Sequence, residues 1–186
     1  MASAEIRLPK VFNNHMVMQQ DKPLVVWGWA NPSETVKVEL ATSSTETQAN
    51  TTGEWKVTLP VMKAGGPYIL KVSGSTNVQF DDVMLGEVWL CSGQSNMEMG
   101  IGMCDNAKEE IAAADYAGIR LLMVPNKWTP EPQSDTTEFA SEGTWRLCSP
   151  KTVAEGGWSG FSAAAYYFGR ELHKQLGVTV GLIDAT

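Results

Sequence analysis

The sequence has little positive charge. Its 14 lysine and arginine residues are outnumbered by 21 aspartate and glutamate residues, which gives a formal net charge of −7. Nucleic acids and anionic membranes attract proteins mainly through basic residues that neutralise their phosphates. The acidic balance argues against both kinds of partner, and we expect the protein to bind neither.

The sequence also lacks long apolar runs and clustered metal-binding residues. No apolar run reaches the roughly 18 residues that a membrane-spanning helix needs, so we expect no membrane span. The three cysteines, Cys91, Cys104 and Cys148, fit no metal-ligand spacing. Gly100-Ile101-Gly102 lacks the third glycine and the preceding strand of a dinucleotide-binding site. We therefore expect neither a metal ion nor a cofactor.

Residues 1–82 have the pattern of short β-strands. Over 36–40 and 55–59, apolar residues alternate with polar ones, as half-buried strands require. Glycine, proline and serine separate the segments at intervals of about ten residues, which favours an antiparallel sandwich. Three tryptophans fit either a sugar-binding platform or the core, and the large area that each would bury favours the core. They are Trp27, Trp29 and Trp55.

From residue 83 onward, predicted strands alternate with predicted helices. Strand–helix–strand units form parallel sheets. We expect the first of three strands to lie at the centre, which would leave the outer edge of the third strand unpaired. The strands are predicted over 83–91, 119–124 and 178–184, and the helices over 105–114 and 162–176. The apolar stripe of the second helix, which should pack on the sheet, is Phe161, Ala165, Phe168, Leu172 and Leu176.

The first of these strands leads into a polar turn. After Cys91 the chain breaks at Ser92-Gly93 and delivers Ser95 to the first turn of a helix. A serine on such a turn projects its hydroxyl from the end of a sheet, beside backbone N–H groups that can hold an oxyanion. Ser95 is therefore a candidate nucleophile. The alternative is structural, because Ser95-x-x-Glu98 also fits a capping box that satisfies helix N–H groups.

A resemblance to a known family extends this interpretation. The string Gly86–Met97, GEVWLCSGQSNM, resembles the first signature block of the SGNH hydrolases, closest to the sialate O-acetylesterase-like carbohydrate esterases. The resemblance implies that Ser95 is the nucleophile and that its N–H contributes to the oxyanion hole. Gln94, Asn96 and Glu98 would frame the pocket. The implied substrate is an acetylated carbohydrate, either a sialic acid ester or an acetylated plant polysaccharide such as xylan, with no metal or cofactor.

The same resemblance implies a fold. It predicts an N-terminal all-β sandwich over 1–82, followed over 83–186 by the first half of a flavodoxin-like three-layer α/β domain. The resemblance favours a secreted or periplasmic location for this protein, although its first residues lack the features of a secretory signal. Four further segments carry the resemblance: 14–20, 26–30, 145–150 and 161–168.

A serine nucleophile needs a base and a group that orients the base. The family's base is a histidine near the C-terminus, and neither His15 nor His173 follows an aspartate at the usual distance of three residues. We expect the base and part of the oxyanion hole beyond residue 186. The remainder of the same protein, or another copy, would then complete the sheet. The competing hypothesis is a non-catalytic carbohydrate-binding or structural fragment.

Overall fold

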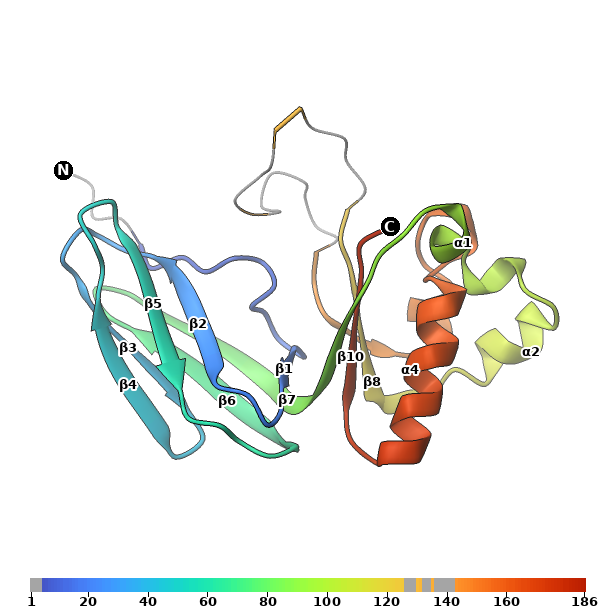
Figure 1. Ribbon diagram of the computed structural model, residues 1–186, viewed down its shortest axis with the longest axis horizontal. Helices are drawn as coiled ribbons and strands as arrows, with labels where there is room; N and C mark the ends of the chain where they lie inside the picture. The colour runs from blue at the N-terminus through green and yellow to red at the C-terminus, as the bar shows by residue number, and fades with distance from the viewer. Residues whose placement is uncertain (1–4, 126–129, 132–134, 136–142) are drawn as a thin grey trace.

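The computed structural model describes residues 5–125, 130–131, 135 and 143–186. The fold is mostly β, with a mixed sheet and few helices (Figure 1). Strands lie in layers at one end of the molecule, and helices lie against a sheet at the other. One long strand, β7 (Asn77–Cys91), runs from the first part into the second.

The layered part contains two sheets. β2 and β5 pair antiparallel in a sheet of their own, while β4, β3, β6 and β7 are successive neighbours in the larger sheet, and β1 also pairs with β7. The bounds of these strands are β1 (Val17–Gln19), β2 (Leu24–Trp29), β3 (Thr35–Leu40), β4 (Ser43–Gln48), β5 (Glu54–Leu59) and β6 (Gly65–Ser73).

The alternating sequence pattern explains the core between these sheets. Val36, Val38 and Leu40 of β3 are completely buried. Trp55 and Leu59 of β5 are almost completely buried. All five belong to one hydrophobic cluster. Because neighbouring side chains of a strand point to opposite faces, the polar residues between them face outward. The predicted core position of Trp55 is confirmed.

Strand β7 belongs to both parts of the molecule. Its early residues pair antiparallel with β6, its middle pairs parallel with β1, and its last residues pair parallel with β10 (Val180–Asp184). The predicted boundary between residues 82 and 83 falls inside this strand, where Asp82 has a left-handed φ of 54°. The division into domains 1–82 and 83–186 thus stays a prediction, and β7 is continuous across it.

The order of the parallel strands differs from the predicted one. β10 lies between β7 and β8 (Tyr116–Met123) and pairs parallel with both. β9 (Arg146–Cys148) pairs antiparallel with the far edge of β8. The predicted order, with the third strand's outer edge open, was therefore wrong. The connection from β7 to β8 passes over one strand position in the sheet, and β10 fills that position. The residues of β10 before Asp184 are uncharged and mostly buried, as suits a central parallel strand.

The open edge belongs to β7 instead. One edge of its last residues pairs with β10, and no described strand pairs with the other edge over Trp89–Cys91. Trp89 and Leu90 are 42% and 69% exposed. The ring of Phe168 lies edge-on to that of Trp89, with centroids 4.9 Å apart. An exposed apolar strand edge of this kind favours pairing with another strand.

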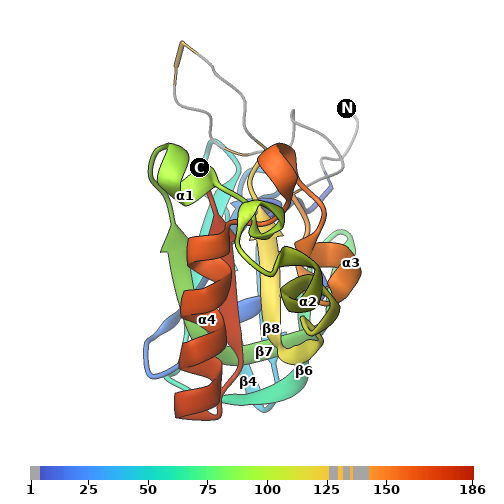
Figure 2. The ribbon, with the colours of Figure 1, turned by 90° about the vertical axis from the view of Figure 1, so that its right-hand side faces the viewer.

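Helices lie on one side of the β7–β10–β8–β9 part of the larger sheet (Figure 2). α4 (Ala163–Leu176) approaches β10 closely at Gly169, where a Cβ atom would lie 2.5 Å from Leu182. The predicted helix over 105–114 is shorter than expected, as α2 (Ala107–Ala112). The other helical elements are η1 (Ile101–Met103), α3 (Pro150–Val153) and η3 (Gly157–Ser159). In the described part of the chain, no helix is long and apolar enough to cross a membrane.

Candidate active site

The one-turn helix α1 (Ser95–Glu98) follows β7 at the end of the sheet, next to the last residues of β10 (Figure 2). The carbonyl of Gln94 starts the helix by accepting the N–H groups of Met97 at 2.7 Å and Glu98 at 3.1 Å. The Ala185 N–H binds the Cys91 carbonyl at 2.9 Å, which holds the end of β7 against the end of β10. The strand–turn–helix predicted around Ser95 is present.

Ser95 is the first residue of α1, and its side chain is exposed. The N-cap is Gln94, and no side chain caps this helix. The capping box that we considered as the structural alternative for Ser95 and Glu98 is therefore wrong. Backbone N–H groups in the first turn of a helix have no acceptor within the helix. The Ser95 N–H is thus available to an outside acceptor, while the catalytic role of Ser95 stays a prediction.

A cavity of about 590 Å³ lies at the carboxyl ends of β8 and β10. Of the predicted site residues, Glu98 lines it, whereas Gln94, Ser95 and Asn96 are exposed on the same short helix and its N-cap. Arg146 and Glu155 form an ion pair in the lining. The charged lining consists of Glu98, Arg146, Glu155 and Asp184.

Asp184 is a cavity-lining residue that the sequence interpretation missed. It ends β10 and is only 6% exposed. Its Oδ2 atom accepts the Ser162 N–H at 3.2 Å, and its Oδ1 atom accepts the Thr186 hydroxyl at 3.0 Å. Burial raises the pKa of the Asp184 carboxyl, the nearby Glu98 carboxylate adds to this, and the hydrogen bonds from Thr186 and Ser162 oppose it. The available signal was an acidic residue at the carboxyl end of an apolar strand, where α/β sheets bind ligands.

Known proteins resemble this chain over nearly its whole length. No family model matches it. Sialate O-acetylesterases from Mus musculus and Homo sapiens are each 31% identical to it, and that from Rattus norvegicus is 30% identical, in each case over 100% of this chain. A solved carbohydrate acetylesterase from Xanthomonas citri superposes with a TM-score of 0.87 at 34% identity over 98% of this chain. This chain is thus similar to sialate O-acetylesterases along its whole length.

The similarity covers a minor share of each relative. This chain spans 36% of the mouse and rat relatives and 38% of the human one. It spans 40% of the Xanthomonas citri chain. The resemblance predicted from Gly86–Met97 is thus confirmed over this whole chain.

Neither of the two histidines lines the cavity. His15 lies in the layered part, with its Nδ1 atom 2.7 Å from Oδ2 of Asp82. His173 lies near the end of α4, where its Nδ1 atom is 2.7 Å from the Val178 carbonyl oxygen. The His173 residue is half-buried. Both histidines therefore have partners away from the cavity.

The described residues offer no group of three or more histidine, cysteine, aspartate or glutamate side chains that could hold a metal ion. Cys91 and Cys148 are buried free thiols, and Cys104 is a half-buried one. Burial raises the pKa of Cys91 to about 11 and that of Cys148 to about 12, with nearby acidic residues adding to both shifts and a backbone hydrogen bond opposing that of Cys148. Thiols with such pKa values are poor nucleophiles at neutral pH.

Proposed function

We propose that the protein is a carbohydrate O-acetylesterase in which Ser95 is the nucleophile. The observation that carries the proposal is the exposed Ser95 hydroxyl on the first turn of α1, in the turn that follows strand β7 at the end of the sheet. A serine presented in this way can reach an ester that binds at the end of the sheet. The relatives, which are sialate O-acetylesterases and a carbohydrate acetylesterase, support the same activity.

In the proposed reaction, Ser95 Oγ attacks the carbonyl carbon of the acetyl ester while a base takes the hydroxyl proton. The ester C–O bond then breaks, the sugar hydroxyl leaves with that proton, and the acetyl group stays on Ser95. Water attacks the acetyl-enzyme, releases acetate and restores the serine. The Ser95 N–H would bind the negative oxygen that forms in both steps.

The base is the part of this mechanism that the described residues do not supply. His15 and His173 both lie away from the cavity and have other partners. We propose that the base and further oxyanion donors come from sequence beyond residue 186. Because the relatives are more than twice as long as this chain, they leave room for such residues.

The same proposal assigns the fold and the partner of the open strand edge. It describes 1–82 as an all-β sandwich and 83–186 as the first half of a flavodoxin-like α/β domain. The shared core of the two layered sheets and the parallel β7–β10–β8 array support it. The exposed edge at Trp89 and Leu90 would pair with the remainder of the same protein or with another copy.

The cavity lining bears on the substrate. The described lining contains three carboxyl groups, those of Glu98, Glu155 and Asp184, and one guanidinium group. That guanidinium belongs to Arg146, which is already paired with Glu155. Like charges repel, so this lining favours a neutral acetylated sugar over the carboxylate of a sialic acid. The names of the curated relatives favour sialic acid esters instead. Acetate release from acetylated xylan and from O-acetylated sialic acid would separate the two.

The decisive experiment for the nucleophile is hydrolysis of p-nitrophenyl acetate by the full-length protein and by Ser95→Ala. Removing a triad serine is expected to lower kcat by about 10³-fold or more. Ser92→Ala is the matched control, because Ser92 is also an exposed serine of this turn and binds only the Ala185 carbonyl, at 2.8 Å. A near-normal rate for Ser95→Ala would remove Ser95 from the mechanism.

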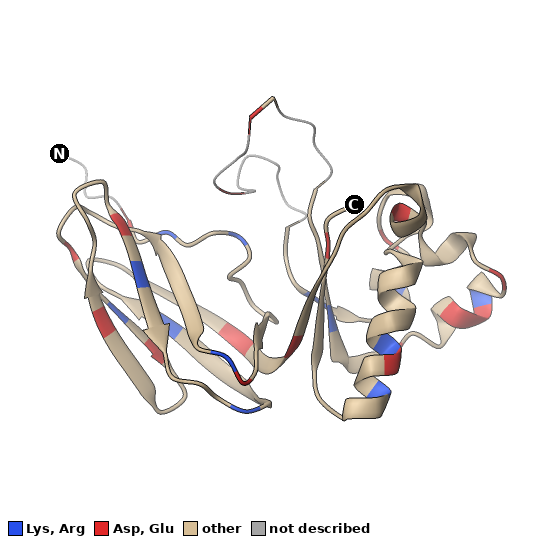
Figure 3. Cartoon of the chain, in the orientation of Figure 1, with Lys and Arg blue, Asp and Glu red and all other residues tan. Residues whose placement is uncertain are grey.

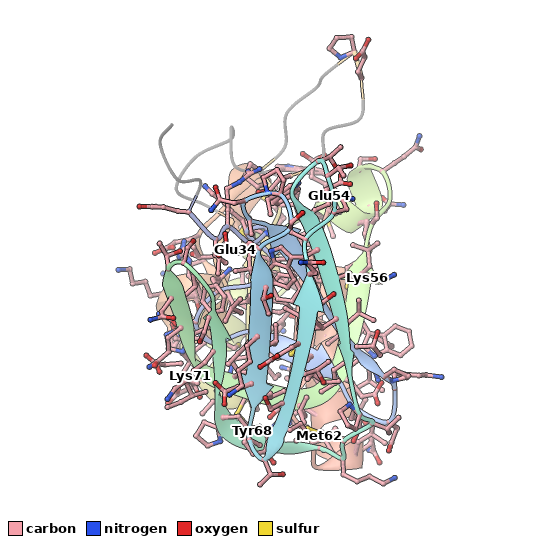
Figure 4. All side chains as sticks on the ribbon, turned by 90° about the vertical axis from the view of Figure 1, so that its left-hand side faces the viewer. Glu34, Glu54, Lys56, Met62, Tyr68 and Lys71 are labelled. Atoms are coloured by element: carbon pink, nitrogen blue, oxygen red, sulfur yellow. The ribbon has the colours of Figure 1, made fainter. Side chains whose placement is uncertain are left out.

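One observation favours a second candidate function, sugar binding without catalysis. Trp27 is 40% exposed, so its predicted core position was wrong. It lines a shallow cavity of about 420 Å³ together with Trp29 and with polar residues that include Glu54 and Lys56. Figure 4 labels Glu54 and Lys56, which lie on β5. Aromatic faces with polar neighbours suit sugar rings. Charges are interspersed over both parts of the molecule (Figure 3), which supports a neutral ligand.

Tryptophan fluorescence during titration with acetylated and deacetylated oligosaccharides would test this candidate. Trp27→Ala should abolish any change that depends on the β2–β5 face. Binding without turnover by the full-length protein would favour the binding function over the esterase.

A further inference from the structure

α1 cannot hold its own position. It is a single turn of four residues, it has no buried residue, and no side chain caps its N-terminus. One helical turn is not stable in isolation, because nucleation fixes several residues for little hydrogen bonding. Whatever places the Ser95 hydroxyl must therefore come from the segments around α1.

The segment that leads into α4 supplies these contacts. Ser162 is completely buried, and its hydroxyl donates a hydrogen bond to the Met97 carbonyl of α1 at 2.5 Å. The last carbonyls of a helix have no donor within the helix, so Met97 needs such a partner. On either side, the Ala163 N–H binds the Met99 carbonyl at 2.9 Å and the Ile101 N–H binds the Phe161 carbonyl at 3.0 Å.

Ser162 is in turn fixed from both sides. Its hydroxyl oxygen accepts the Ala165 N–H at 3.3 Å, which caps α4. Its own N–H donates to Asp184 Oδ2 at 3.2 Å, and Asp184 ends the central strand β10. A continuous path of hydrogen bonds thus runs from the sheet through Asp184 and Ser162 to the helix that carries Ser95.

We propose that Ser162 and Asp184 are positioning residues for Ser95, holding α1 to the end of the sheet through the Met97 carbonyl. The proposal rests on the proposed role of Ser95 as nucleophile. In this role both residues act through the Met97 carbonyl rather than on the ester. A displacement of the reacting atom by about 1 Å can cost about 10²-fold in rate, and a buried hydroxyl that ties down an otherwise unsupported turn controls displacements of that size.

The test is the steady-state kinetics of p-nitrophenyl acetate hydrolysis by the full-length protein. Ser162→Ala removes the donor to Met97, and we expect kcat to fall about 10- to 100-fold while KM changes by less than about twofold. Asp184→Asn keeps an oxygen that accepts the Ser162 N–H, so its kcat should exceed that of Asp184→Leu. Asp184→Leu has no acceptor and should resemble Ser162→Ala.

A control separates positioning from loss of stability. Val38→Ala opens a cavity at a completely buried site of β3, far along the chain from α1, and lowers stability without touching the path. Its kcat should stay at the wild-type value at temperatures where it is folded. A wild-type kcat for Ser162→Ala, or an equal loss for Val38→Ala, would overturn the proposal.

Amide hydrogen exchange over residues 94–99 gives a readout that does not need activity. Exchange there should be faster in Ser162→Ala than in wild type and unchanged in Val38→Ala. If Ser95→Ala were fully active, the esterase mechanism would fail, and the exchange result alone would decide whether Ser162 holds α1. Unchanged exchange in Ser162→Ala would refute that role.

Discussion

Asp82 joins side chains from three distant segments. Its Oδ2 atom lies 2.7 Å from Nδ1 of His15 and 3.0 Å from Nη1 of Arg120, and its Oδ1 atom accepts a hydrogen bond from Nη2 of Arg120 at 3.3 Å. The Arg120 side chain is 6% exposed, and that of Asp82 is 28% exposed. Among the described residues, Nε and Nη1 of Arg120 make no hydrogen bond. The Asp82 charge is thus the main compensation for a buried cation.

Asp82→Asn removes that charge with little other change. Asparagine has nearly the same shape and tolerates the left-handed φ of 54° at this position. Removing one partner of a buried ion pair costs about 3–5 kcal/mol. Because Asp82 is partly exposed and an amide oxygen can still accept one hydrogen bond, we expect a loss of about 2–3 kcal/mol in the free energy of unfolding.

Asp21→Asn is a closely matched control. Asp21 also has a left-handed φ, 56°, and pairs with Lys63 at 2.7 Å, but the two side chains are 48% and 86% exposed. Exposed ion pairs contribute about 0–1 kcal/mol. Urea unfolding followed by far-ultraviolet circular dichroism would give both free energies. The reasoning fails if Asp82→Asn is no more destabilising than Asp21→Asn.

Two further predictions concern titration and thiol reactivity. Burial opposes ionisation of Glu34, but hydrogen bonds from Ser75 and Asn31 outweigh it and lower the pKa from 4.5 to about 2. A carboxyl whose pKa is lower in the folded than in the unfolded state stabilises the fold above its unfolded pKa, so the free energy of unfolding should fall as the pH drops from 4.5 to 2. Glu34→Gln should flatten this part of a pH–stability curve. Iodoacetamide at pH 8 should modify Cys104 alone in the folded protein, because burial raises the pKa values of Cys91 and Cys148 to about 11 and 12; mass spectrometry showing more than one adduct before unfolding would contradict this.

Local features were predictable from the sequence. The strand over 83–91 and the helical turn at Ser95 follow from an apolar run broken by Ser92-Gly93, and both are present. The alternation in β3 and β5 likewise predicted which residues are buried. Each of these features depends on neighbours within a few residues, so the pattern contains the necessary information.

Features that depend on distant pairing were not predictable. The position of β10 between β7 and β8 is a choice among strand orders that no local pattern distinguishes. Phe168 was expected to be buried with its helical stripe, but it is 41% exposed, because the edge of β7 that it lies beside has no partner strand. The link from Asp184 to Ser162 joins residues 22 positions apart and gave no sequence signal.

The continuity of β7 has a mechanical consequence. A flexible linker would let the two parts move relative to each other. Strand β7 instead crosses the junction without a break and pairs with β6 and β1 up to Gly86 and with β10 from Glu87 onward. A rotation about residue 82 would have to break the pairing of β7 with β1 or β6 and the ion pair between Asp82 and Arg120. The orientation of the layered strands relative to a ligand at the end of β7 is therefore set during folding rather than adjusted afterwards.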